Sequence, residues 1–258
     1  MMTSYYNMAV NLTYKLINLN LTYKILALML KVAIVSLLSY EKIVKTIEKL
    51  GVKIVDSNPD FVITYGGDGT ILYSERIYPS IPKITFKGSE LCMRCYYNIS
   101  DVEKVIENII RGNYHIVSEV KLEAFTKGQR LQALNEIQVH NKVPTRAIRF
   151  SVFVDGREFR DLVGDGVIIS TPFGSTGYYM SVGGKPFKKG IGVAFNNLHM
   201  RKIRSFTVPL RTKIKVTVDR GDCFLIADNA DEFIELGTGD KVLIMRASGK
   251  AKFVKIFE

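Results

Sequence analysis

The stretch that decides the fold is Phe61-Val62-Ile63-Thr64-Tyr65-Gly66-Gly67-Asp68-Gly69-Thr70. It is an apolar, β-prone run that ends in three glycines around one carboxylate and one hydroxyl. We expect a buried strand that enters a tight turn, where the missing Cβ atoms let backbone N–H groups approach a bulky anion. Helix-forming residues follow from Ile71, so the turn also predicts a helix N-terminus, which binds phosphate readily.

A carboxylate in such a loop repels phosphate unless it has a chemical task or holds a metal. The phosphate loop Gly66, Gly67, Gly69 and Thr70, with Asp68 inside it, therefore indicates phosphoryl-transfer chemistry. The loop lacks the lysine of a Walker loop and the dinucleotide glycine pattern. The alternative is a glycine-rich turn that serves packing alone, which is common in α/β folds.

Strands alternate with helices between residues 29 and 114. This alternation predicts a parallel sheet in a three-layer α/β domain that binds phosphate. The expected strands are 30–37, 52–56, 61–65 and 82–86, and the expected helices are 40–50, 70–77 and 101–111.

Residues 115–258 change character to short β-prone segments separated by turn residues. They predict a β-rich second domain, either a sandwich or an irregular layered sheet. A cleft between the two domains is then the default ligand site. The expected strands are 115–126, 130–140, 146–154, 157–163, 166–171, 203–209, 212–218, 222–227, 232–236 and 241–246.

Residues 1–28 differ from the rest, with Lys15 and Lys24 as their only charged side chains. They match neither a secretory signal nor a transit peptide. We expect a mis-assigned start or a dispensable extension, because a natural first strand begins beside Met29. The alternative is an amphipathic helix that packs on the body of the protein or on a partner.

The composition is that of a globular chain with a basic excess. The 258 residues are 47% hydrophobic and carry a net charge of +11. This excess is either a solvated cationic surface or a field that attracts a multiply charged small anion. A nucleic-acid partner is not expected, because no RNA-binding signature or basic helix with interleaved aromatics appears. No apolar run is long enough to predict a membrane span.

The three cysteines argue against a disulfide framework and for a reducing compartment. Cys92 and Cys95 have the CxxC spacing, but no second pair follows. We expect ordinary packing for them, with metal or redox use as the alternative.

Two further segments have chemical character. Asn135-Glu136 lies inside a β-prone run. Neighbouring side chains of a strand point to opposite faces, so both can serve one site only near a strand end or a bulge. A plain edge turn is the alternative. Residues 165–178, Asp-Gly-Val-Ile-Ile-Ser-Thr-Pro-Phe-Gly-Ser-Thr-Gly-Tyr, form an apolar strand followed by a loop rich in hydroxyls and glycine. Such a loop reads a base edge or a ribose, and Tyr178 adds a stacking face.

These segments, in this order, resemble the NAD kinase family, including its archaeal and bacterial members, within the wider group of kinases that share a GGDGT-type loop. A fourth, weaker block runs from His199 through Arg204 to Val208-Pro209. The resemblance implies an α/β domain followed by a β-rich domain, with NAD bound between them, in a homodimer or homotetramer in the cytoplasm. It implies transfer of a phosphoryl group from ATP or another polyphosphate donor, with Mg²⁺ or another divalent cation, to the 2′-hydroxyl of NAD, which gives NADP.

The resemblance also implies roles for single residues. Asp68 would be the general base at the ribose 2′-hydroxyl, with Gly69 and Thr70 beside the phosphates. Arg146 would meet a phosphate or ribose, and Asp165 the nicotinamide end. No protein side chains are assigned to a metal. The other expected NAD-binding residues are Asn135 and Glu136, with Thr176, Gly177, Tyr178, Tyr179, Met180 and Ser181 around the adenine and its ribose.

The chain departs from the family pattern in several places. Residues 85–93 lack the usual asparagine and two glycines, Val163 replaces a frequent arginine, and the family's glutamine or asparagine has no clean match around Asn229-Ala230. A C-terminal helix that returns to the first domain is not expected. The rival hypotheses are a lipid kinase of the diacylglycerol or sphingosine type, which shares GGDGT, and an inactive dinucleotide-binding regulator.

Overall fold

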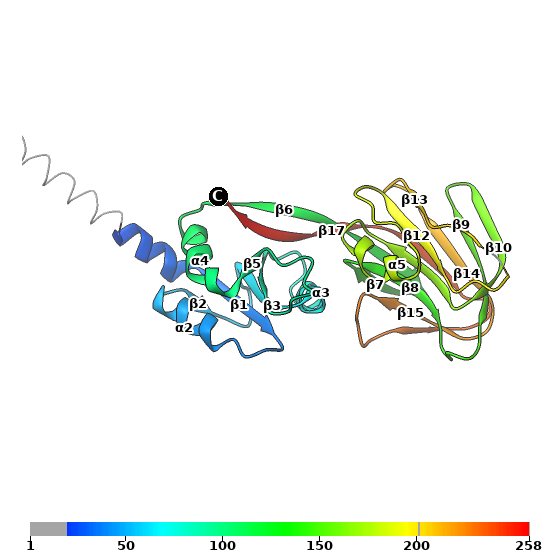
Figure 1. Cartoon of the computed structure of the whole chain (residues 1–258), viewed down its shortest axis with the longest axis horizontal. Coiled ribbons are helices and arrows are strands. Elements are labelled where there is room, and N and C mark those ends of the chain that lie inside the picture. The colour runs from blue at the N-terminus through cyan, green and yellow to red at the C-terminus, as the bar shows by residue number, and fades with distance from the viewer. Residues whose placement is uncertain (1–19, 201, 258) are drawn as a thin grey trace, which may run out of the picture. The chain divides into compact units, whose positions relative to one another are not determined.

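The computed structural model describes residues 20–200 and 202–257. The chain divides into two compact units. Among the described residues, unit 1 comprises 20–117 and 252–257, and unit 2 comprises 118–200 and 202–251. Figure 1 shows the elements of both units along the colour gradient.

Unit 1 is built on a parallel sheet, as the alternating pattern predicted. The strand order is β2 (Lys53–Ile54), β1 (Lys31–Ser36), β3 (Phe61–Gly66) and β4 (Lys83–Lys87), with the short β5 (Tyr97–Asn98) beside β4. Strand β3 is buried along almost its whole length, as expected for a strand covered on both faces.

Helices cover both faces of this sheet and give the predicted three layers. On one face, α2 (Glu41–Lys49) and α4 (Val102–Ile110), which follows the 3₁₀ turn η1 (Ile99–Asp101), pack on the strands. Ile43 and Ile47 are four residues apart, so both point from α2 into the core. On the other face, α3 (Asp68–Ile77) packs on β3.

Residues 20–29 form a helix ahead of β1. Ala27 of this helix is buried in the unit 1 core, and Tyr23 packs against the same cluster. Residues 20–28 of the expected extension therefore form a helix that packs on the core of unit 1, which fits the helical alternative better than a dispensable segment. The expectation for residues 1–19 lies outside the described residues.

Unit 2 consists of β-sheets packed face to face. One antiparallel sheet has the order β13-β12-β11-β8-β15-β16, and the facing strands run β10-β9-β14-β17. The hairpin β6–β7 adds to β17. The strands are β6 (Tyr114–Thr126), β7 (Gln129–Ala133), β8 (Glu136–Asn141), β9 (Ile148–Val154), β10 (Arg157–Gly164), β11 (Gly166–Ser170), β12 (Ile191–Asn196), β13 (Phe206–Val208), β14 (Ile214–Arg220), β15 (Cys223–Ala227), β16 (Ile234–Leu236) and β17 (Lys241–Ile256).

The core of unit 2 lies between the two sheets. Val139 and Val167 from the first sheet share one cluster with Phe150 and Val216 from the second. Residues of β14 alternate between buried and exposed, which is the pattern of strands with one face on a core. The expected β-rich domain is thus a sandwich.

Three differences from the expected elements matter for the site. The expected strand 130–140 is broken between β7 and β8, so Asn135 lies in the gap and Glu136 begins a strand. Strand β12 was not predicted. Strand β17 continues to Ile256, and Phe253 pairs with Lys83 of β4. Residues 252–257 therefore belong to unit 1 rather than to the expected second domain.

Among the described residues, no helix is both long and apolar enough to cross a membrane.

Candidate functional site

The glycine-rich turn of unit 1 leads directly from β3 into the first turn of α3. The helix begins at Asp68 itself, with Gly67 as its N-cap, so the carboxylate lies where the helix dipole favours negative charge. A side chain on Gly66 would collide with the Thr70 hydroxyl, which explains the glycine there. The turn therefore combines close backbone approach with a positioned carboxylate.

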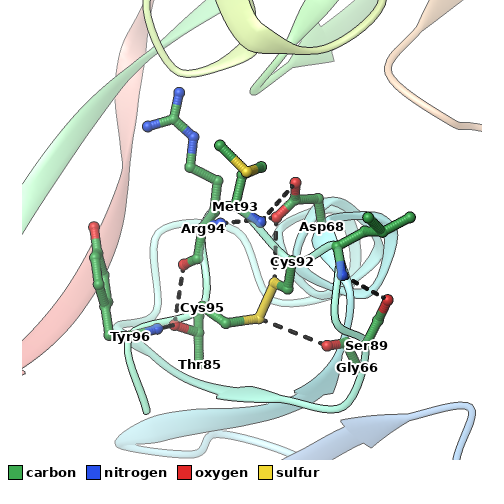
Figure 2. The surroundings of a disulfide bond; sticks show 10 residues. Gly66, Asp68, Thr85, Ser89, Cys92, Met93, Arg94, Cys95 and Tyr96 are labelled. Carbon is green, nitrogen blue, oxygen red and sulfur yellow. Dashed lines mark hydrogen bonds between the residues drawn. A yellow bond between two sulfur atoms is a disulfide. The ribbon is translucent and has the colours of Figure 1, made fainter. Parts of the chain in front are cut away.

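The Asp68 carboxylate is held by the loop between β4 and β5. The backbone N–H of Arg94 donates to Oδ1 at 2.9 Å, and that of Met93 approaches Oδ2 at 3.3 Å. Cys92 Sγ lies 3.3 Å from Oδ1 (Figure 2). Asp68 is half-buried, so it is oriented but still open on one side.

Cys92 and Cys95 are joined in a disulfide, and the expectation of ordinary packing was wrong for this pair. Their Cα atoms are 5.7 Å apart, a separation that a disulfide spans without backbone movement. The turn geometry of residues 92–95 brings the two sulfur atoms together. Cys223 is free and buried.

In unit 2, Asn135 and Glu136 lie where the chain enters β8. The loop after β11 closes over this entry point. The hydroxyl of Thr171 donates to the Leu134 carbonyl, and a Cβ on Gly174 would collide with the Asn135 backbone. Two blocks far apart in the sequence therefore meet at the start of β8.

Asp228 fixes this entry point, a role that was not predicted from the sequence. Its Oδ1 accepts the N–H groups of Asn135 at 2.7 Å and Glu136 at 3.0 Å, and its Oδ2 accepts that of Leu134 at 2.8 Å. Asp228 itself has a φ of 53° directly after β15. The only available signal was an acidic residue at a strand end, one position before the unmatched Asn229-Ala230.

Burial and a neighbouring charge raise the pKa of the Glu136 carboxyl group. Its side chain is buried, and desolvation, followed by the negative charge of Asp228, raises the pKa of Glu136 to about 8 against a lowering contribution from Gln138. Glu136 Oε2 is buried and has no hydrogen-bond partner among the described atoms. Partial burial likewise raises the pKa of Asp228 to about 6, although its three N–H donors oppose the shift. Glu136 thus offers a polar atom that a ligand can satisfy.

The loop after β11 forms a 3₁₀ turn, η2 (Gly174–Thr176), and a short helix, α5 (Tyr178–Ser181). Gly177 lies next to the Asn135 side chain, since a Cβ on Gly177 would lie 3.4 Å from Asn135 Nδ2. Thr176 is half-buried, and Met180 and Ser181 are exposed. These residues surround the start of β8 on the loop side.

The two tyrosines of this loop differ in environment. Tyr178 is half-buried, and its hydroxyl accepts a hydrogen bond from Asn196 Nδ2 at 3.1 Å. Tyr179 is only 1% exposed and packs with Ile168 and Ala194. Tyr178 therefore presents a polar edge, whereas Tyr179 supports the loop from inside.

Asp165 lies between β10 and β11. It accepts hydrogen bonds from Asn197 Nδ2 at 3.0 Å and Asn141 Nδ2 at 3.3 Å. The same Asn141 amide donates to the backbone carbonyl of Arg146 at 3.2 Å, and the Arg146 side chain is exposed. Asn141 therefore links two predicted site residues within unit 2.

Comparisons with known proteins show which family the sequence of this chain resembles. Residues 134–256 match the family model described as the ATP-NAD kinase C-terminal domain. The NAD kinase of Thermoplasma volcanium is 31% identical over 232 residues, which cover 85% of this chain and 84% of that protein. The bifunctional NADP phosphatase/NAD kinase of Methanococcus maripaludis is 29% identical over 75% of this chain and 36% of its own length.

Solved structures share the fold. A yeast NADH kinase complexed with NADH has a TM-score of 0.79 at 19% identity, over 88% of this chain and 84% of that chain. An NAD kinase from Archaeoglobus fulgidus in complex with ATP has a TM-score of 0.75 at 21% identity, over 88% and 94% of the two chains. The predicted combination of an α/β and a β-rich domain is confirmed.

Proposed function

This chain belongs to the NAD kinase family, and from that premise we propose how its residues carry out the transfer of a phosphoryl group to NAD. The chain is an enzyme that phosphorylates NAD at the 2′-hydroxyl of the adenosine ribose and yields NADP. The observation that carries the assignment of roles is the Asp68 carboxylate, which lies in a glycine-rich turn and is held there by two backbone N–H groups.

Asp68 accepts the proton of the 2′-hydroxyl as the oxygen bonds to the terminal phosphorus of the donor and the bond to the leaving phosphate breaks. The transition state of phosphoryl transfer is loose, so orientation of the hydroxyl and stabilisation of phosphate charge supply most of the catalysis. The backbone of Gly66, Gly67 and Gly69, with Thr70 at the start of α3, lies beside the phosphates. The positive end of the α3 dipole favours their charge.

The cluster around the start of β8 binds the adenosine half of NAD. The unpartnered Glu136 Oε2 supports this assignment, because a buried polar atom gains a hydrogen bond when a ligand arrives. Asn135, Thr176 and Gly177 line the same place. Tyr178, Met180 and Ser181 complete the contact surface, and the buried Tyr179 supports it without touching NAD.

Asp165 and Arg146 both contact NAD. Their common link to Asn141 supports a shared role. We assign Asp165 to the nicotinamide end and the exposed Arg146 to a phosphate or ribose.

ATP or another polyphosphate is the phosphoryl donor, together with Mg²⁺. Within the described residues, no group of three or more His, Cys, Asp or Glu side chains forms a metal cage. Mg²⁺ usually keeps several water ligands and binds substrate phosphates, so the phosphates of the phosphoryl donor would hold the cation here. The cation would neutralise phosphate charge, while Asp68 accepts the proton of the 2′-hydroxyl.

The family resemblance also supports a homodimer or homotetramer that acts in the cytoplasm without nucleic-acid or membrane partners. Size-exclusion chromatography with light scattering tests the oligomeric state. A monomeric active enzyme would contradict that part of the proposal.

A substrate panel tests the function. Purified protein is incubated with ATP and Mg²⁺, or with inorganic polyphosphate, and is offered NAD, NADH or diacylglycerol. We expect NADP, detected with a dehydrogenase that requires it. Phosphorylated diacylglycerol without NADP would support the lipid kinase, and binding of NAD without turnover would support the inactive regulator.

A further inference from the structure

The disulfide Cys92–Cys95 lies beside Asp68, and we propose that this cysteine pair is a reversible thiol–disulfide modification site that controls how Asp68 is positioned. The class of reactant it takes is a small disulfide or a small thiol. This inference rests on the proposed role of Asp68 as the base, and it adds a form of control that the phosphoryl-transfer chemistry does not itself require.

The pair is open to exchange. Cys92 and Cys95 are both half-buried, and the residues next to Cys92 reach solvent, with Leu91 85% and Met93 71% exposed. Cys223, in contrast, is fully buried. A small thiol can therefore approach the pair while the third cysteine is shielded.

The loop that carries the pair is anchored at its ends. At the start, the Gly88 N–H donates to the Gly66 carbonyl at 2.9 Å, where a Cβ on residue 88 would meet Leu38, Gly66 and Tyr65. At the end, the Tyr96 N–H donates to the Thr85 hydroxyl at 3.0 Å. The two anchors hold the loop to the end of β3 and to β4.

The middle of the loop is closed by the disulfide. The ring between Cys92 and Cys95 encloses Met93 and Arg94, whose N–H groups point at the Asp68 carboxylate (Figure 2). The Thr85 hydroxyl also donates to the Arg94 carbonyl, at 3.3 Å. The disulfide thus restrains the same two residues that orient the base.

Reduction returns backbone freedom to residues 92–95, because ordering a residue costs entropy that the covalent link helps to offset. The two N–H donors then hold Asp68 less firmly. Since a base acts best when it is fixed in the reactive geometry, we expect the disulfide form to turn over faster than the dithiol form.

The modification balances as two thiol–disulfide exchanges. One cysteine thiolate attacks the small disulfide and releases the first small thiol, and the other thiolate then displaces the second. One S–S bond forms in the loop and one breaks in the oxidant. The two protons and two electrons lost by the cysteines end on the two released thiols.

The test uses the full chain in mixtures of oxidised and reduced glutathione at rising ratios. Free thiols are alkylated and counted by mass spectrometry, and kcat and KM for NAD are measured in the same samples. The parent needs no substitution to reach either state. Cys92→Ser/Cys95→Ser removes the pair, and Cys223→Ala is the matched control.

We expect reduction to add two alkylated cysteines to the parent and to lower its kcat roughly tenfold, with a smaller change in KM. This loss in kcat is below the ~100-fold that an ångström-scale misplacement can cost. Cys92→Ser/Cys95→Ser should remain near the reduced parent at every ratio. Cys223→Ala should follow the parent.

An unchanged thiol count across the mixtures would overturn the exchange site. Equal turnover in both states, or faster turnover after reduction, would overturn the control of Asp68. A titrating thiol count in samples that never form NADP would instead reject the proposed function and leave the modification site standing.

Discussion

The carboxylate of Asp228 accepts the backbone N–H of Asn135 at 2.7 Å, across 93 positions of the sequence. With Leu134 and Glu136 bonded in the same way, one side chain fixes three consecutive peptide groups at the start of β8. Asp228 therefore fixes the backbone at the predicted adenosine site.

Asp228→Asn should weaken NAD binding and lower stability together. The amide keeps one acceptor oxygen but turns an N–H₂ group toward the Leu134 N–H, so one backbone donor loses its partner at a cost of about 1–3 kcal/mol. Urea denaturation and calorimetric titration with NAD measure the two effects. Asp222→Asn, an exposed site nearby in the sequence, is the control. Unchanged values for Asp228→Asn would show that the three bonds do not position the site.

Asp68→Asn should lower kcat by roughly 10²–10⁴-fold and leave NAD affinity within a few-fold, the range typical of a lost general base. The amide keeps the shape but cannot accept the hydroxyl proton. Steady-state kinetics and titration with NAD separate the two quantities. Glu41→Gln removes an exposed carboxylate of α2 and controls for net charge. A variant with parental turnover would exclude Asp68 as the base.

Stability should fall as the pH rises through the range set by Glu136. Its pKa is raised from 4.5 to about 8 in the folded protein, so between these values the folded state retains a proton that the unfolded state has lost. The free energy of unfolding therefore decreases with rising pH across that window, by the linkage relation. Urea denaturation at a series of pH values measures the slope. Glu136→Gln should flatten it above about pH 6, because Asp228, whose pKa is raised to about 6, gives a slope of the same sign below that pH. An equal slope above about pH 6 in both proteins would remove Glu136 as its source.

Asn135→Ala and Thr176→Val should mainly raise the KM for NAD. Each removes one hydrogen-bonding group from a desolvated site, at about 1–3 kcal/mol, or ~5- to 150-fold in affinity. Thr207→Val, on the exposed side of β13, is the matched control for the threonine. Unchanged affinity in both variants would remove the adenosine assignment and reopen the substrate class.

Removal of one partner from the buried ion pair between Lys83 of β4 and Glu75 of α3 should strongly destabilise unit 1. Lys83 is 0% exposed and also donates to the Tyr78 carbonyl at 2.7 Å. Glu75→Gln leaves the lysine charge without its carboxylate and should cost about 3–5 kcal/mol. The double variant Glu75→Leu/Lys83→Met should lose less, because neither charge remains buried. Denaturation curves that rank the two variants in the reverse order would contradict this account.

Local pattern was sufficient to predict β3 and the turn into α3, because an apolar run followed by glycines has few other structures. The sequence also indicated that Asn135 and Glu136 can act together only near a strand end or a bulge, but the break before β8, which provides the strand end, was not predicted. The sandwich followed from short alternating segments.

The parts that escaped prediction depend on contacts between distant residues. Asp228 acquires its role only because β15 pairs with β8, with Ala227 opposite Ile137. The part of β17 from Ser248 onward contains serine, glycine and lysine, so its strand conformation depends on its partners β4 and β6. The disulfide requires a turn that the CxxC spacing permits but does not impose.

The path of β17 has a consequence for biosynthesis. Val254 lies in the same core as the first strand, β1, and Phe253 pairs with β4. Residues 252–257 must therefore leave the ribosome before the core of unit 1 can be completed, although nearly all other residues of that unit are synthesised before unit 2. Unit 2 is uninterrupted in sequence, so it can fold before the last strand of unit 1 has formed. A nascent chain that stalls at this stage would leave the edge of β4 that pairs with β17 open to chaperones.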